Sequence, residues 1–256
     1  MTQHLHLMAI GAHAGDVEVT AGAAILRHTR QGHRATLVHL TLGAKGHQTL
    51  SDEEYGQQKR SEATEAARRL GAGVYFLPYG DGELAPTDEA KMRVADLIRK
   101  LRPTHLITHW PGSIHKDHVA AYAIVKDAIY YAAVPSFRRA HPAHEVIGPY
   151  LAENWEDNVG YVPHIYLDVT PVFEEWVEAI RSYELFAGGV SSFNYLNYYC
   201  ALATLRGTAA GYARAVTFST DHPLAAYLSD GFDQTVRLFT TASPMFRPEL
   251  KRDSVG

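Results

Sequence analysis

Two histidine-rich stretches carry most of the residues in this sequence that could do chemistry. The first, GAHAGDVEVTAG over residues 11–22, places His13 and Asp16 three positions apart. The second, HWPGSIHKDH over residues 109–118, holds three histidines and an aspartate. A catalytic zinc ion takes three protein ligands, commonly imidazoles and a carboxylate, and keeps a fourth position open. His13, Asp16 and one histidine of the second stretch would supply these three ligands.

A single histidine, taken alone, is weak support for a metal site. The sequence has fifteen, and most histidines in proteins are surface residues or hydrogen-bonded core residues. The joint pattern favours a metal because each compact stretch follows a predicted strand. Cys200 is the only cysteine, which excludes both an internal disulfide bond and a cysteine metal cluster.

Strand-like and helix-like patterns alternate through the first half of the chain. Strands are predicted at residues 5–10, 35–42, 74–77 and 105–108, and helices at 21–30, 51–70, 88–101 and 117–132. This alternation predicts an α/β fold, a Rossmann-like, mostly parallel sheet with helices on both faces. Ligands of such sheets bind at the carboxyl ends of the strands. Both histidine-rich stretches are therefore expected at one edge of the sheet.

The pattern becomes less regular after residue 135. A strand is predicted at residues 164–169 and helices at 171–185 and 195–215, followed by a polar tail. We therefore predict a single domain over residues 1–256. Its Rossmann-like core would span residues 1–135, and a C-terminal α+β extension over 136–256 would complete the site.

Composition narrows the function classes. The chain is 46% hydrophobic and 20% charged with a formal net charge of -4, which is typical of a soluble globular protein. It has no block of Lys or Arg to neutralise phosphates, so we expect no nucleic-acid partner. It also lacks an apolar run of the roughly 18 residues that would cross a bilayer. We expect no membrane partner and a cytoplasmic location.

With both stretches in view, the sequence resembles the PIG-L/LmbE-like family of zinc-dependent N-deacetylases, which includes enzymes of bacillithiol and mycothiol biosynthesis. The first family signature, Ala-His-(Pro or Ala)-Asp-Asp followed closely by Glu, corresponds to AHAGDVE at residues 12–18. The second, His-x-Asp-His, corresponds to HKDH at 115–118. Shorter agreements extend the resemblance over most of the chain: RSEA at 60–63, LG at 70–71, GDG at 80–82 and YA at 212–213.

The resemblance implies roles for individual residues. It assigns a zinc ion, or another divalent metal, to His13, Asp16 and His118. It makes His115 the group that stabilises the oxyanion or protonates the leaving amine, with Asp117 beside it.

The resemblance also implies a homo-oligomer and a small-molecule substrate. Arg60 would help to hold that substrate, although an equally good interpretation is a helix-surface cation that pairs with Glu62 or Glu65. The acidic stretch 153–157 and the tyrosines between 195 and 199 could line a sugar site. Alternatively, the tyrosines pack a helix or form a subunit interface. Loops at the expected active edge carry Lys45, His47, Asp81 and Trp110.

Gly15 departs from the family pattern, because the family's general base is the aspartate at this position. A general base typically contributes about 10²- to 10⁴-fold to a rate. Three alternatives remain open. Another carboxylate replaces the base, with Glu18 nearest in sequence and Asp117 or Glu153 as further candidates; the substrate supplies the base or the reaction differs; or the protein binds a ligand without turnover.

The leading hypothesis is a metal-dependent amidohydrolase that removes an acyl group, most simply acetyl, from an N-acylated amino sugar or a related small molecule. The alternative is a metal-binding family member without deacetylase turnover. A dinucleotide-dependent oxidoreductase is disfavoured, because Gly11-x-x-x-Gly15 does not match the Gly-x-Gly-x-x-Gly fingerprint.

Overall fold

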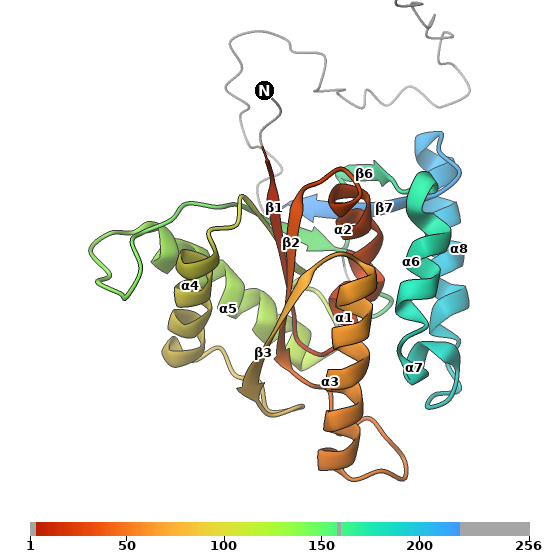
Figure 1. The fold of residues 1–256 in the computed structure, drawn as a ribbon, viewed down its shortest axis with the longest axis horizontal. Coiled ribbons are helices and arrows are strands. Elements are labelled where there is room, and N and C mark those ends of the chain that lie inside the picture. Colours follow the sequence, from red (N-terminus) through yellow and green to blue (C-terminus); the bar gives the residue numbers. More distant parts are fainter. Residues whose placement is uncertain (1–3, 158–159, 221–256) are drawn as a thin grey trace, which may run out of the picture.

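The computed structural model describes residues 4–157 and 160–220, and a sheet of seven strands forms its centre (Figure 1). The strand order is β3-β2-β1-β4-β5-β7-β6. The strands β3, β2, β1, β4 and β5 are parallel to their neighbours, whereas β7 pairs antiparallel with both β5 and β6. The predicted mostly parallel sheet is therefore confirmed. The strands are β1 His6–Gly11, β2 Arg34–Thr41, β3 Gly73–Tyr79, β4 His105–His109, β5 Ile147–Ala152, β6 Ile165–Asp168 and β7 Ala215–Thr220.

Helices cover both faces of this sheet, as the alternating pattern predicted (Figure 1). Alternate residues of β1 point to opposite faces: Leu7 and Ala9 pack with α2, α3, α6 and α8, and Met8 and Ile10 pack with α4 and α5. The helices are α1 Asp16–Thr20, α2 Gly22–Thr29, α3 Asp52–Arg69, α4 Asp88–Leu101, α5 Lys116–Ala133, α6 Phe173–Ile180, α7 Glu184–Ala187 and α8 Tyr195–Ala210, with a 3₁₀ turn at Thr170–Val172.

The C-terminal part differs most from the prediction. The helix predicted at 195–215 ends at Ala210, because Gly211 adopts a left-handed conformation with φ of 79° that terminates the helix. The strand β7 follows it. The helix predicted at 171–185 is split into the 3₁₀ turn, α6 and α7. Residues 221–256 of the predicted extension lie outside the described part of the chain.

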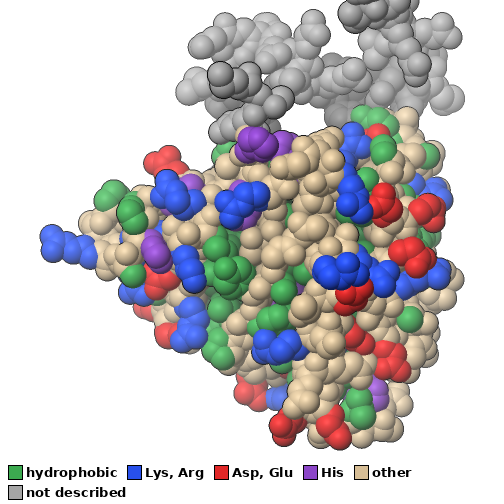
Figure 2. Space-filling view, viewed as in Figure 1, with side chains coloured by type: hydrophobic (Ala, Val, Ile, Leu, Met, Phe, Trp, Pro, Cys, Tyr) green, Lys and Arg blue, Asp and Glu red, His purple; other side chains and the backbone are tan. Residues whose placement is uncertain are grey.

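The surface carries charges of both signs. On the face seen in Figure 2, Lys and Arg side chains are interspersed with Asp and Glu. Within the described ranges, none of the helices is long and apolar enough to cross a bilayer.

A buried polar network holds the turn after β1 in place. The Glu18 side chain, 0% exposed, accepts hydrogen bonds from the Gly15 N–H at 3.1 Å and the Tyr183 hydroxyl at 2.6 Å. Its carboxylate also lies 3.2 Å from Nε2 of His39 on β2. The backbone carbonyl of Glu18 accepts from the indole N–H of Trp176 on α6 at 2.8 Å. One glutamate thus ties α1 to the sheet and to the helices that cover it.

The charge of Glu18 is stabilised despite its burial. Burial alone raises the pKa of this carboxyl, but His39 and the Tyr183 hydroxyl outweigh it, so the pKa lies below its usual value. An ionised carboxylate can accept from all its neighbours at once. The network is therefore a structural support of the turn.

We expect Glu18→Ala to lower the free energy of unfolding by about 2–4 kcal/mol, because it leaves buried donors without an acceptor. Urea unfolding monitored by circular dichroism measures this change. Glu65→Ala is the control, since Glu65 pairs with Arg68 and Arg69 on the exposed side of α3, where such pairs contribute at most about 1 kcal/mol. Equal unfolding midpoints for wild type and Glu18→Ala would contradict the structural role.

Candidate metal and active site

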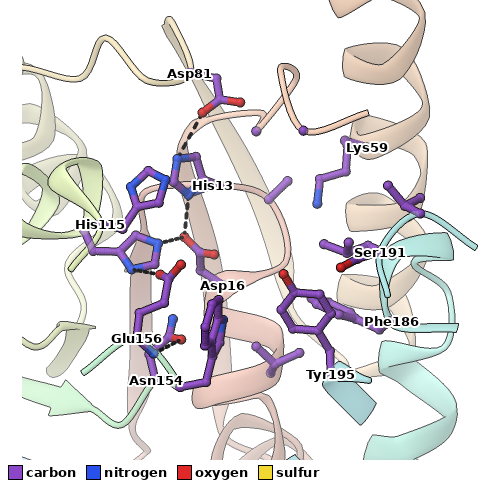
Figure 3. Close-up of a pocket in the computed structure, with 18 of the residues that line it drawn as sticks. His13, Asp16, Lys59, Asp81, His115, Asn154, Glu156, Phe186, Ser191 and Tyr195 are labelled. Atoms are coloured by element: carbon purple, nitrogen blue, oxygen red, sulfur yellow. Dashed lines mark hydrogen bonds and ion pairs between the residues drawn. The ribbon is translucent and has the colours of Figure 1, made fainter. Parts of the chain in front are cut away.

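The two histidine-rich stretches meet at the carboxyl edge of β1 and β4 (Figure 3). His13 lies in the turn after β1, Asp16 begins α1, and His118 lies in the first turn of α5. The carboxylate oxygen Oδ2 of Asp16 is 3.1 Å from Nδ1 of His13 and 3.2 Å from Nε2 of His118. One potential ligand atom from each residue lies within 4.8 Å of the others. The structure therefore brings together the three residues expected to bind metal.

The electrostatics of this cluster suit a cation. Burial lowers the pKa of His118, but Asp16 and Glu156 outweigh it and raise the pKa to about 9. Burial also lowers the pKa of His13, yet its carboxylate neighbours raise it well above the usual value. Conversely, the two histidines hold the pKa of Asp16 well below its usual range although burial raises it. Two imidazoles and a carboxylate that attract positive charge fit a divalent ion such as zinc.

Three further carboxylates contact His13 and His118 at the ring nitrogens that do not face Asp16. Nε2 of His13 lies 3.2 Å from Asp117 Oδ2 and 3.2 Å from Asp81 Oδ1. Nδ1 of His118 lies 3.0 Å from Glu156 Oε2. Such carboxylates fix the ring orientation and raise the basicity of a metal-binding histidine. His13, His115 and Asp117 form a second possible donor group, which shares His13 with the first.

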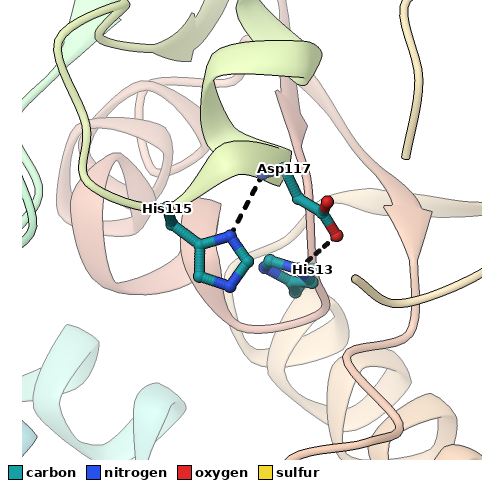
Figure 4. Close-up of side chains that lie close together, drawn as sticks. All are labelled: His13, His115 and Asp117. Carbon is teal, nitrogen blue, oxygen red and sulfur yellow. Dashed lines mark hydrogen bonds and ion pairs between the residues drawn. The ribbon is translucent and has the colours of Figure 1, made fainter. Parts of the chain in front are cut away.

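His115 lines the cavity and is placed to donate a hydrogen bond there. It caps the N-terminus of α5, where its Nδ1 accepts the backbone N–H of Asp117 at 3.2 Å (Figure 4). Burial and the nearby His13 and His118 lower the pKa of His115. A neutral imidazole that accepts at Nδ1 carries its hydrogen on Nε2. This N–H has no hydrogen-bond acceptor among the described residues, and it therefore suits hydrogen bonding to a developing oxyanion or a leaving amine.

The candidates for the missing base lie away from the cavity. Glu18 is enclosed in the network beneath the turn, and Glu153 pairs with Arg206. Asp117 is fully buried, with its Oδ2 accepting the Gly82 N–H at 2.7 Å. The geometry therefore gives Glu18 a structural position and lends no support to its predicted role as a base.

The space next to Gly15 is occupied by other side chains. A Cβ atom at this position would lie 3.0 Å from the Phe186 ring and 3.4 Å from Nζ of Lys59. Gly15 also has a φ of 112°, which side-chain-bearing residues rarely adopt. The local packing is therefore built around a glycine.

Lys59, and not Arg60, is the basic residue of helix α3 that lines the cavity. Arg60 is exposed, with its guanidinium 4.3 Å from the centroid of the Phe76 ring. Its neighbour Lys59 is buried and lines the cavity. The substrate role predicted for Arg60 gains no support from this placement.

The cavity over the cluster has a volume of about 360 Å³. Its opposite wall comes from the α7–α8 segment, including Phe186, Ser191 and Tyr195 (Figure 3). In the tyrosine stretch, Tyr195 lines the cavity, and the 4% exposed Tyr199 packs in the core while also lining it. Of the four loop residues expected at the active edge, Asp81 lines the cavity.

His109 is an additional site residue that received no individual role from the sequence. Its Nε2 accepts the Ala12 N–H at 2.9 Å, and its ring stacks on that of His118 with centroids 4.1 Å apart. Burial and His118 lower the pKa of His109 to about 4. A neutral His109 thus fixes the turn and the ring plane of His118. Its position as the last residue of β4 was the available signal.

Comparison with known proteins identifies relatives with two kinds of activity. The chain is 26% identical over 190 residues to 4-oxalmesaconate hydratase from Pseudomonas putida, covering 68% of this chain and 71% of that protein. It is 27% identical over 180 residues to 1D-myo-inositol 2-acetamido-2-deoxy-alpha-D-glucopyranoside deacetylase from Streptomyces scabiei, covering 59% of this chain. That match spans 53%, about half, of the deacetylase.

A solved structure has the same fold. The 4-carboxy-2-hydroxymuconate hydratase from Pseudomonas putida superposes with a TM-score of 0.80 at 22% identity, covering 90% of this chain and all of that chain. The sequence profile of PIG-L, described as GlcNAc-PI de-N-acetylase, matches residues 8–129. This range contains both histidine-rich stretches and the three clustered residues His13, Asp16 and His118. The resemblance to the PIG-L/LmbE-like family that the sequence indicated is therefore confirmed over this range.

Proposed function

We propose that this protein is a metal-dependent amidohydrolase that removes an acyl group, most simply acetyl, from an N-acylated amino sugar or a related small molecule. The observation that carries the proposal is the convergence of His13 and His118 on one oxygen of Asp16 at the floor of an open cavity. The deacetylase activity named for the Streptomyces scabiei relative supports it.

Each residue of the cluster has a distinct task in this proposal. His13, Asp16 and His118 hold the ion, which when bound polarises a carbonyl oxygen and lowers the pKa of a water molecule. Asp81 and Asp117 hold the ring of His13. Glu156 does the same for His118.

His115 acts on the substrate. Its Nε2–H donates to the oxygen that gains charge when water adds to the amide carbon, and such a donor in a protected site stabilises the transition state. The proton that the leaving amine gains comes from the added water, because a neutral His115 offers a hydrogen bond and no acidic proton. This role uses the orientation that the Asp117 N–H imposes on the ring.

A second reaction class is favoured by Gly15. The glycine removes the carboxylate that would take a proton from water, so amide hydrolysis proceeds without that assistance. The Pseudomonas putida relative, of which the match covers 71%, is a hydratase. Addition of water to the double bond of an unsaturated acid is therefore the second candidate. It is distinguished by a loss of ultraviolet absorbance of 4-oxalmesaconate without release of an amine.

We expect the purified wild type to hold about one divalent ion per chain and His118→Ala to bind it at least about tenfold more weakly, because one of three ligands is lost. Metal analysis after dialysis against zinc measures this. His141→Ala, which changes an exposed histidine, is the control. Equal metal content in wild type and His118→Ala would contradict the assigned ligands.

We expect Asp117→Asn to lower kcat/KM about 10- to 100-fold, because the amide holds His13 less strongly than the carboxylate does. Acetate release from a panel of N-acetylated amino sugars and their conjugates measures the effect. Asp127→Asn on the same helix is the control, since Asp127 is 46% exposed and pairs with Lys91. A panel in which the wild type hydrolyses no compound would overturn the amidohydrolase proposal.

We expect Gly15→Asp to lower rather than raise acetate release, and to destabilise the fold by about 1–3 kcal/mol through backbone strain alone. The added carboxylate must also displace Phe186 or Lys59. Gly32→Asp is a matched control, because Gly32 has a φ of 84° but no neighbouring atom within 4 Å of a Cβ atom. Faster turnover by Gly15→Asp with unchanged stability would show that the pocket accepts a base at this position.

A further inference from the structure

Lys59 is a buried cation that the proposed chemistry leaves without a task. Its side chain is 3% exposed, yet it lines the cavity from α3 (Figure 3). Among the residues that the structure describes, no carboxylate lies within 4 Å of Nζ and no side-chain or backbone oxygen accepts a hydrogen bond from it. Its neighbours are aromatic faces, with Nζ 4.8 Å from the Tyr183 centroid and 5.9 Å from the Tyr55 centroid.

An amine in this position is costly for the folded protein. A buried charge without a paired partner destabilises a fold, and aromatic faces return only part of that free energy. Burial lowers the pKa of Lys59, while Asp16 and other carboxylates at longer range partly oppose this effect. The amine therefore lacks the close anion that normally accompanies a buried lysine.

The position of Gly15 explains why Lys59 has no close carboxylate. Nζ of Lys59 lies 3.4 Å from the point where a side chain at residue 15 would begin. An acidic side chain at this position would put a carboxylate beside the amine from within the protein. With glycine there, the close anion must come from a bound molecule.

We propose that Lys59 binds a carboxylate group of the substrate, so that the cavity selects N-acyl compounds that carry a negative charge over neutral sugars. The amine and the His13, Asp16 and His118 cluster border one cavity of about 360 Å³. A substrate would place its acyl carbonyl at the cluster and its carboxylate at Lys59. Ser191 and Tyr195 line the same cavity and offer hydroxyl donors to this group.

This inference rests on the proposed function for the position of the acyl group, but not for the charge of the ligand. A charge-assisted hydrogen bond to a largely buried amine is among the stronger polar interactions. An added carboxylate should therefore improve binding by about tenfold or more. Binding can be measured separately from turnover.

The test uses three acids with increasing carboxylate spacing: N-acetylglycine, N-acetyl-β-alanine and 4-acetamidobutanoate. Each is compared with its neutral primary amide by isothermal titration calorimetry on the zinc-treated protein. We expect at least one acid to bind wild type about tenfold or more tightly than its amide. Lys59→Met should bring that ratio to about one.

Lys126→Met is the matched control, because Lys126 is an exposed lysine whose Nζ also lies over a tyrosine ring, 5.6 Å from the Tyr122 centroid. It should keep the preference for the acid. A preference for acids that persists in Lys59→Met would overturn the proposal. So would equal binding of every acid and amide by wild type, a result that requires no variant to fold.

Acetate release from the same compounds separates this inference from the proposed function. If wild type binds the acids more tightly but releases no acetate, the Lys59 proposal stands and the amidohydrolase proposal is overturned. If wild type binds acids and amides with equal affinity and hydrolyses them with equal kcat/KM, the amidohydrolase proposal stands and the Lys59 proposal is overturned.

Discussion

The shared contact of His13 and His118 with one oxygen of Asp16 is the constraint on which the site depends. Three buried polar side chains this close together require a fixed backbone. Small displacements would leave a buried polar atom without its partner, which costs free energy. Two parallel strands and the N-terminus of α5 provide that backbone. The Glu18 network supports it from below, where it joins the turn to β2 and α6.

Most of the first half of the fold could be predicted from the sequence, since its strands and helices are long and regularly patterned. The ends of the sheet could not. The strand β5 contains Gly148 and Pro149, which weaken a strand pattern. Its partner β7, at residues 215–220, lies almost entirely in the segment predicted to be a polar tail. Both strands are defined by tertiary pairing, with Leu151 opposite Ser219, rather than by local preference.

The site residues divide along the same line. His13, Asp16 and a histidine of the second stretch could be predicted as a candidate metal site, because suitable residue types follow two strand ends. The choice of His118 came from the family resemblance. Lys59 carried a weaker signal: it stands four residues after Tyr55 and four before Ala63, on the buried side of α3, where a charged residue is unexpected. Phe186 carried none, because its place in the cavity comes from the packing of α7 against a distant turn.

Gly15 shows how one residue can alter a site without disturbing the cluster of His13, Asp16 and His118. Gly15 has a backbone conformation that favours glycine, and the Phe186 ring packs against it. An acidic side chain at this position would therefore also require the backbone and Phe186 to move. The same glycine leaves the amine of Lys59 beside open cavity instead of beside a carboxylate. A loss of negative charge on the protein thereby becomes a preference for negative charge on the ligand, because the buried cation gains a close counter-ion when an anion binds.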